Sequence, residues 1–168
     1  MKKFNVRFLV QAAVIASIYC VLVILATITP YGALNFGPIQ MRISEALTVL
    51  PFFTPAAIPG LFVGCLISNI VGVASGVSFG AIDIVLGSLA TLAAAFASYA
   101  LRRKKWLVAL PPVVINAVVI GFELSYFLPQ QPWWFYVLTV GAGQIIACYG
   151  LGMPLLLALE KHKGIFKQ

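Results

Sequence analysis

The stretch FLVQAAVIASIYCVLVILATIT, from Phe8 to Thr29, contains no charged residue and is followed by Pro30. A helix that crosses the hydrocarbon core of a membrane needs about 20 such residues. The stretch is too long for the core of a cleavable signal peptide, and no clear cleavage site follows it. Its side chains do not alternate in polarity, as those of an outer-membrane barrel strand would. We therefore interpret it as the first of several membrane-spanning helices.

The rest of the chain has the same character. Of its 168 residues, 62% are apolar and 9% are charged, whereas a soluble domain is about 45–50% apolar and about 25% charged. This composition excludes a soluble fold. Despite the net charge of +7, the composition also excludes a disordered tail and a nucleic-acid-binding domain, because apolar residues are many and basic residues are few. We expect an all-α integral membrane protein with six transmembrane helices in a single domain, residues 1–168.

Prolines, glycines and basic runs divide the apolar sequence into six segments. The predicted helices are Phe8–Thr29, Ile43–Phe53, Ala56–Val73, Ala81–Leu101, Leu107–Leu128 and Trp133–Leu159. The second and third segments together are too short for two full spans of about 20 residues each, so they are expected to be short, tilted or irregular. Irregular backbone at membrane depth must be covered by protein or line a cavity, and the shortfall therefore hints at a cavity.

Basic residues indicate the orientation, because Lys and Arg collect at the cytoplasmic ends of membrane helices. Ten of the eleven lie before the first span, between the fourth and fifth, or after the sixth: Lys2, Lys3, Arg7, Arg102, Arg103, Lys104, Lys105, Lys161, Lys163 and Lys167. Six spans place all ten on one face, so both termini are predicted to be cytoplasmic. Anionic membrane lipid is their expected partner. Trp133, Trp134 and Tyr136 are predicted to form an aromatic anchor at the outer surface.

The remaining charged residues are the candidates for function. Arg42 lies at the outer end of the second segment, and Glu45, Asp83 and Glu123 lie in or beside spans. An ionised side chain in lipid costs at least about 2.5 kcal/mol, so such residues face the protein interior or a water-filled cavity. Three of them also have a simpler explanation. Arg42 and Glu45 are three apart, the spacing of a pair across one helical turn, and Asp83 has the position of a helix N-cap.

Three amides, Asn69, Asn116 and Gln144, join these residues in the outer half of the membrane. Asn116 precedes Glu123 by seven residues, which places it on the same helix face about 10 Å deeper. Asn69 and Gln144 could instead form interhelical hydrogen bonds. Because the cytoplasmic halves of the spans carry almost no polar residues, the pattern favours a pocket that opens outward over a channel.

Enzymatic chemistry finds little support. The only histidine, His162, lies after the last span, and the sequence contains no histidine–cysteine metal cluster and no nucleotide-binding P-loop. Cys20, Cys65 and Cys148 lie inside apolar runs and are interpreted as packing residues. We expect a protein that is not an enzyme and that needs no cofactor in this chain.

The run FGPIQMRISEALTVLPFFTPAAIPGLFVGCLISN, from Phe36 to Asn69, resembles the QueT family. These proteins are substrate-binding S-components of energy-coupling factor (ECF) importers, assigned to the uptake of queuosine precursors. The first span also contains Ala12-x-x-x-Ala16, which is similar to the motif by which S-components dock onto the transmembrane T-component. The same spacing is also common in ordinary packing between helices of one chain.

The resemblance implies a bacterial plasma-membrane protein that captures its substrate outside and topples in the membrane to release it inside. Two ABC ATPase subunits would power this through the T-component. The implied substrate is 7-cyano- or 7-aminomethyl-7-deazaguanine. A carboxylate, Glu123 first, would accept the N–H groups of its guanine-like edge. The other implied contacts are Asn116, Arg42, Glu45, Asn69, Asp83 and Gln144, with Phe36, Tyr126 or Phe79 stacking on the ring and residues 31–40 as a lid.

Two other functions remain open at this point. The chain could be an S-component for another vitamin or nucleobase, which the same acids and amides would also suit. It could also be an ion-driven secondary carrier, but that class is expected to show polar groups in both halves of the membrane and an internal repeat. Neither feature is visible in the sequence.

Overall fold

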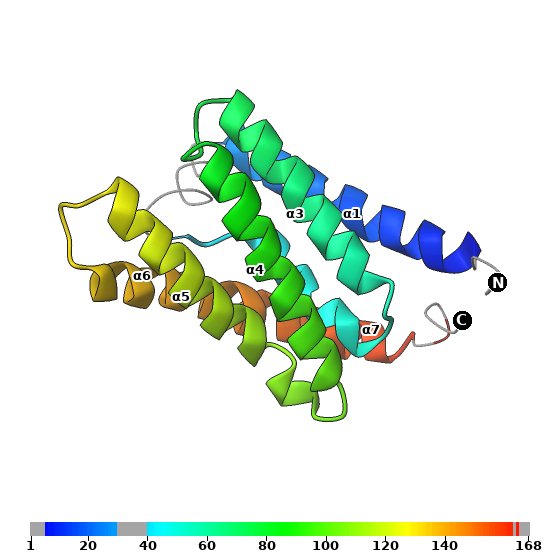
Figure 1. Cartoon of the computed structure of the whole chain (residues 1–168). Coiled ribbons are helices and arrows are strands. Elements are labelled where there is room, and N and C mark those ends of the chain that lie inside the picture. The colour runs from blue at the N-terminus through cyan, green and yellow to red at the C-terminus, as the bar shows by residue number, and fades with distance from the viewer. Residues whose placement is uncertain (1–5, 30–39, 163, 165–168) are drawn as a thin grey trace.

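The computed structural model describes residues 6–29, 40–162 and 164, and within them every regular element is a helix. The predicted all-α fold is therefore confirmed. Figure 1 shows the elements in chain order. They are α1 (Val6–Thr27), η1 (Ile43–Phe52), α3 (Ala57–Ala74), α4 (Ala81–Ala100), η2 (Lys105–Leu107), α5 (Leu110–Phe127), α6 (Trp133–Ile145), η3 (Ile146–Gly152) and α7 (Met153–Glu160).

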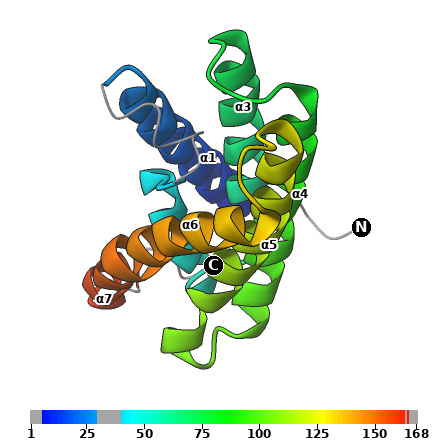
Figure 2. The ribbon, with the colours of Figure 1, turned by 90° about the vertical axis from the view of Figure 1, so that its left-hand side faces the viewer.

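Five stretches are long and apolar enough to cross a membrane, namely 6–27, 57–74, 81–100, 105–127 and 133–160. The first four of these pack in chain order, α1 on α3, α3 on α4 and α4 on α5, and α5 packs on α6 (Figures 1 and 2). The turn between α3 and α4 uses Gly76 and Gly80 at φ values of 70° and 96°, a backbone region that glycine enters without steric penalty. This turn and the α5–α6 turn lie at the upper left in Figure 1, away from the start of α1 and the end of α7.

The second predicted segment, Ile43–Phe53, is not a long helix. The chain forms the ten-residue 3₁₀ helix η1, with Pro51 inside it. At about 2.0 Å per residue, η1 is only about 20 Å long, against a hydrocarbon core of about 30 Å. It contacts α1, α3, α4, α7 and η3, and Figure 2 shows it between α1 and α6. Other helices of the protein therefore cover η1. Its short, irregular form agrees with the prediction made from the length of the segment.

The last apolar stretch is interrupted rather than uniform. Between α6 and α7 the backbone widens into the π-helix η3, a form that often marks a functional site. Gly152, at its end, lies so close to η1 that an added Cβ would be 3.1 Å from the Ala46 carbonyl oxygen. The irregular part of this helix thus lies against the irregular helix η1.

Two glycines of α3 allow a close contact with α1. A Cβ at Gly60 would lie 2.8 Å from the Ala12 carbonyl oxygen, and a Cβ at Gly64 would lie 2.8 Å from Tyr19 Cβ. Small residues four apart allow such close approach between membrane helices. Ala12, Ala16 and Tyr19 are all buried against this surface, so one face of α1 is fixed on α3.

The outside of the helix bundle is apolar and much of its inside is polar. Large side chains such as Val10, Leu25, Phe96 and Leu138 are exposed, whereas fifteen polar or charged residues are buried among those described. This distribution suits a protein whose surface faces lipid. Trp133 and Trp134 are exposed, as interfacial anchors require. Tyr136 is not such an anchor, because it is buried and its hydroxyl donates to the Leu128 carbonyl at 2.6 Å.

Candidate functional site

Four charged side chains are buried among the described residues: Arg42, Glu45, Asp83 and Glu123, which are 1–5% exposed. They come from the start of η1, from η1, from the first turn of α4 and from α5. We call these four residues the charged cluster. Since an unpaired buried charge is costly, the partners of each member decide what the cluster can bind.

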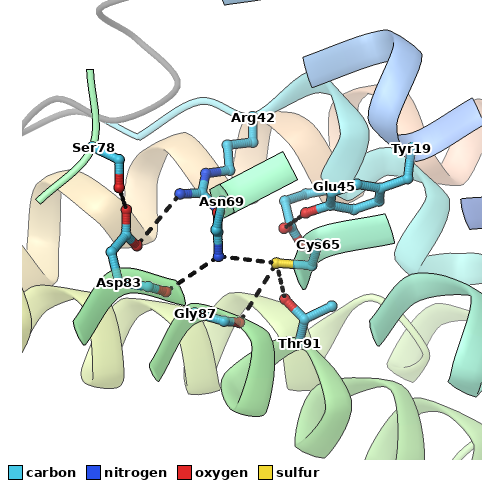
Figure 3. A network of polar contacts seen from close by, with 9 residues as sticks. All are labelled: Tyr19, Arg42, Glu45, Cys65, Asn69, Ser78, Asp83, Gly87 and Thr91. Carbon is cyan, nitrogen blue, oxygen red and sulfur yellow. Dashed lines mark hydrogen bonds and ion pairs between the residues drawn. The ribbon is translucent and has the colours of Figure 1, made fainter. Parts of the chain in front are cut away.

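Asp83 is the partner of Arg42. Arg42 Nη2 lies 3.8 Å from Asp83 Oδ1, and the Ser78 hydroxyl donates to Asp83 Oδ2. The prediction that Asp83 is a helix N-cap is wrong, because α4 begins at Ala81 with Gly80 as its cap residue. Asp83 lies three residues past the cap position, and its carboxylate points to Ser78 and Arg42 instead (Figure 3). It still benefits from the positive end of the helix dipole.

Glu45 is held by two neutral donors. The Tyr19 hydroxyl donates to Oε1 at 2.6 Å, and Asn116 Nδ2 donates to Oε2 at 3.3 Å. Asn116 also donates to Gln144 Oε1 at 3.5 Å. The Glu45 carboxylate thus joins α1, η1 and α5, and Asn116 extends the network to α6. Its donors come from distant helices, so the local pairing with Arg42 is not needed to account for the burial of Glu45.

Asn69 lies between these two groups in Figure 3. Its Nδ2 donates to the Asp83 carbonyl at 3.2 Å and to Cys65 Sγ at 3.5 Å, and Thr91 donates to the same sulfur at 3.3 Å. The interhelical bonds predicted for Asn69 and Gln144 are thus present in the structure. Asn69 Oδ1 is buried and has no hydrogen-bond partner among the described residues, so it remains available as an acceptor.

Glu123 has the least satisfied carboxylate in the described chain. Both of its oxygens are buried without a hydrogen-bond partner there, and the charged groups that interact with it are Asp83 and Arg42. Its stem lines an apolar crevice of about 310 Å³ between α4 and α5. Protonation would not remove the problem, because the carboxyl O–H would then need an acceptor as well. Such orphan buried acceptors call for a donor from beyond the described residues, a role that a ligand can fill.

No three His, Cys, Asp or Glu side chains in the described ranges come together in a way that could hold a metal ion. The cluster offers acceptors on three carboxylates and Asn69, and one strong donor, the Arg42 guanidinium. A small polar molecule with several N–H groups and one acceptor fits such a set.

Comparison with known proteins agrees with a membrane transporter. A sequence model described as the QueT transporter matches residues 9–161. The chain belongs to the QueT transporter family. This membership, together with the five long apolar helices, makes it a multi-pass protein of the plasma membrane.

One curated relative of this QueT-family chain is the "Queuosine precursor transporter QueT" of Lactococcus lactis subsp. cremoris (strain MG1363). It is 38% identical over 93 residues, which is 55% of this chain and 49% of the relative. The matched region thus spans about half the length of that relative. No solved structure matches the chain significantly.

The residues that the resemblance implied as substrate contacts differ in where they lie in the structure of this QueT-family chain. Arg42, Glu45, Asn69, Asp83, Asn116, Gln144 and Glu123 are all buried. Phe36, and the proposed lid apart from Gln40, lie outside the described residues. Tyr126 is exposed at the rim of the α4–α5 crevice. Phe79 stacks on Phe127 with ring centroids 5.3 Å apart.

Sequence reasoning missed Tyr19, Cys65 and Cys148, which all contact the buried polar network. Cys148 Sγ lies 3.6 Å from Thr48 Oγ1 and from Gln144 Oε1. A signal for Tyr19 did exist. It follows Ala12 and Ala16 at helical spacing, so it had to share their packed face, and a buried tyrosine hydroxyl needs a partner.

Ala12 and Ala16 are mostly buried against α3. They also form the floor of an apolar groove of about 230 Å³, together with Leu9, Ala13, Pro59 and Val63. Ala13 is exposed in this groove. The motif of this QueT-family chain therefore packs internally on α3 and also borders an accessible groove.

Proposed function

We propose that this QueT-family protein is the substrate-binding S-component of an ECF-type importer and that its substrate is a queuosine precursor. The observation that carries the proposal is the charged cluster with its amides, assembled from α3, α4, α5, α6 and η1 inside apolar helices. The name of the Lactococcus relative supports the substrate class. The ligands considered are 7-cyano- and 7-aminomethyl-7-deazaguanine.

Glu123 is the proposed acceptor for the guanine-like edge. That edge presents adjacent N–H donors, and Glu123 has two buried oxygens with no partner in the described chain. A bidentate pair of charge-assisted bonds would satisfy both. Arg42 would donate to the ring carbonyl, and Asn69 Oδ1 would accept a further N–H. Asp83 would keep Arg42 in place through their ion pair of 3.8 Å.

The proposed orientation places the charged cluster toward the outside. Asp83 lies in the first turn of α4, and Arg102 and Arg103 follow the other end of this 20-residue helix. Because basic residues stay in the cytoplasm, the Asp83 end would be external. With the short η1 region as the sixth crossing, both termini would be cytoplasmic.

The proposed partners are a transmembrane T-component and two ABC ATPase subunits, which would supply the energy for import. A helix of the T-component would occupy the apolar groove over Ala12, Ala13 and Ala16. Small side chains there allow close helix approach. Large apolar side chains cover the lipid-facing surface, which suits a protein that reorients in the membrane.

Equilibrium binding to the purified chain tests the proposal. Radiolabelled 7-deazaguanines of both forms are added to the protein in detergent, with unlabelled guanine, riboflavin and thiamine as competitors. We expect saturable binding of at least one 7-deazaguanine that the two vitamins do not displace. Absence of saturable binding by both 7-deazaguanines would overturn the proposal.

A further inference from the structure

Glu45 and Glu123 lie at different depths of the charged cluster. Asn116 Nδ2 is 3.3 Å from Glu45 Oε2, and Asn116 precedes Glu123 by seven residues on α5. Seven residues advance an α-helix by about 10 Å. Asp83 and Arg42 are the charged groups beside Glu123, and in Figure 3 Asp83 and Glu45 lie on opposite sides of Asn69. A ligand held by Glu123 would therefore meet Glu45 at its far end.

The charge in the cluster is not balanced. Its members are three carboxylates and one guanidinium, so the ionised cluster carries an excess of two negative charges. Arg42 forms its ion pair with Asp83, and its charge also acts on Glu45 and Glu123, so three carboxylates share one cation. The hydrogen-bond donors that hold Glu45 are a tyrosine hydroxyl and an amide, which are neutral. Buried carboxylates that outnumber their counter-ions are strongly disfavoured, so a cationic ligand would be favoured here over a neutral one.

The geometry around Glu45 suits an ionised acceptor that can take one more donor. Each oxygen already accepts one hydrogen bond, and the O–H···O distance from Tyr19 of 2.6 Å is typical of a charge-assisted bond to a carboxylate. A carboxylate has about four acceptor positions, so two internal donors do not saturate it. Tyr19 and Asn116 therefore fix the direction of the carboxylate and leave acceptor capacity for a third hydrogen bond.

We propose that Glu45 is the counter-ion of a ligand ammonium group and that the protein selects the 7-aminomethyl form over the neutral 7-cyano form. This inference rests on the proposed function. The guanine-like edge and the 7-substituent lie on opposite ends of the ring system, as Glu123 and Glu45 lie at opposite ends of the charged cluster. The aminomethyl arm carries a protonated amine at neutral pH, and the cyano arm carries no charge.

Titration calorimetry on the full chain in detergent tests the selection without any variant. The ligands are the 7-aminomethyl, the 7-cyano and the 7-methyl forms of 7-deazaguanine, the last being uncharged with a similar arm. We expect the aminomethyl form to bind at least about tenfold more tightly than the other two. Equal affinities would overturn this inference and leave the proposed function intact. Absence of binding by all three would overturn the proposed function itself.

The Glu45→Gln variant tests whether Glu45 causes the preference for the aminomethyl form. We expect the affinity for the aminomethyl form to fall at least about tenfold, while that for the cyano form stays within about threefold. Glu160→Gln is the matched control, because it removes a carboxylate outside the cluster, paired with Lys105 at 3.4 Å, and should change neither affinity. A parallel loss of both affinities in Glu45→Gln would make Glu45 structural and overturn its role as counter-ion.

Discussion

Glu45 and Glu123 are both buried carboxylates, but their surroundings differ in kind. Glu45 has a donor on each oxygen, whereas Glu123 has none in the described chain. A fixed carboxylate with spare acceptor capacity suits a positioned counter-ion, and an unsatisfied one suits direct recognition of two N–H groups. The two residues are therefore expected to respond differently to the same chemical change.

The Glu123→Gln variant tests direct recognition. The amide replaces one acceptor oxygen with an NH₂ group, which would face the N–H donors of the ligand. An unsatisfied buried group costs about 1–3 kcal/mol, and about 1.4 kcal/mol is a tenfold change, so 7-deazaguanine binding should weaken at least about tenfold. The dissociation constant from equilibrium binding measures this effect.

Glu160→Gln again serves as the control and should bind as wild type does. Equal affinities of wild type and Glu123→Gln would remove Glu123 from the site. Asp83 would then be the next candidate for the guanine-like edge, since its Oδ1 also lacks a hydrogen-bond donor among the described residues.

Much of the site was predictable at this scale because lipid excludes charge. Glu45, Asp83 and Glu123 stand out in apolar segments whatever the fold. Their partners were not predictable, since the pairing of Arg42 with Asp83 requires the start of η1 to lie beside the first turn of α4. Nothing in the spacing of Arg42 and Glu45 indicates that approach. Tyr19 was hidden for a similar reason, because its partner is 26 residues away.

The helices differ in how directly their sequences determine them. The long helices follow from uninterrupted apolar runs, and their observed bounds lie within two or three residues of the predicted ones. The form of η1 does not follow from composition, because Pro51 and the contacts with five neighbours act together. The π-helix η3 likewise depends on its close packing against η1, which periodicity does not show.

The α1–α3 contact gives a prediction about stability. Gly64→Ala places a Cβ 2.8 Å from Tyr19 Cβ, and overpacking of this kind costs about 1–3 kcal/mol. We expect the midpoint of thermal unfolding in detergent to fall by at least about 3 °C. Gly150→Ala is the matched control, because its nearest neighbour, Ile146 Cγ2, is 3.9 Å away, and it should not lose stability. Unchanged stability in Gly64→Ala would mean that α1 and α3 are less tightly packed.

The groove over α1 gives a second prediction for this helix. Ala13→Trp should fill the groove from its exposed position and abolish uptake in cells, while the purified variant still binds its ligand. Bulky residues at Ala12 or Ala16 would also disturb the packing of α1 on α3, because both alanines are buried there. Val114→Trp, on the exposed surface of α5, is the control and should transport normally. Loss of ligand binding in Ala13→Trp would identify the groove as internal packing only.

The whole molecule combines an apolar exterior with a charged cluster near one end of α4 and a basic run beyond the other. Because the two groups of charges lie at opposite ends of α4, an orientation in the membrane can be assigned from charge alone. It also links the cluster to one side of the membrane, because Asp83 and the α3–α4 turn occupy the same end of the helix bundle. If the orientation were reversed, the cluster would face the cytoplasm and could not capture a ligand from outside.

Accessibility labelling tests this orientation. Single cysteines are placed at Gln130, in the α5–α6 turn, and at Lys104, between α4 and α5, in a chain whose three native cysteines are replaced by alanine. Both positions are exposed in the structure. Because basic residues remain cytoplasmic, a membrane-impermeant thiol reagent added to intact cells should label Gln130→Cys and not Lys104→Cys. Lysis should make both reactive. Labelling of Lys104→Cys alone in intact cells would reverse the topology and contradict capture from the outside.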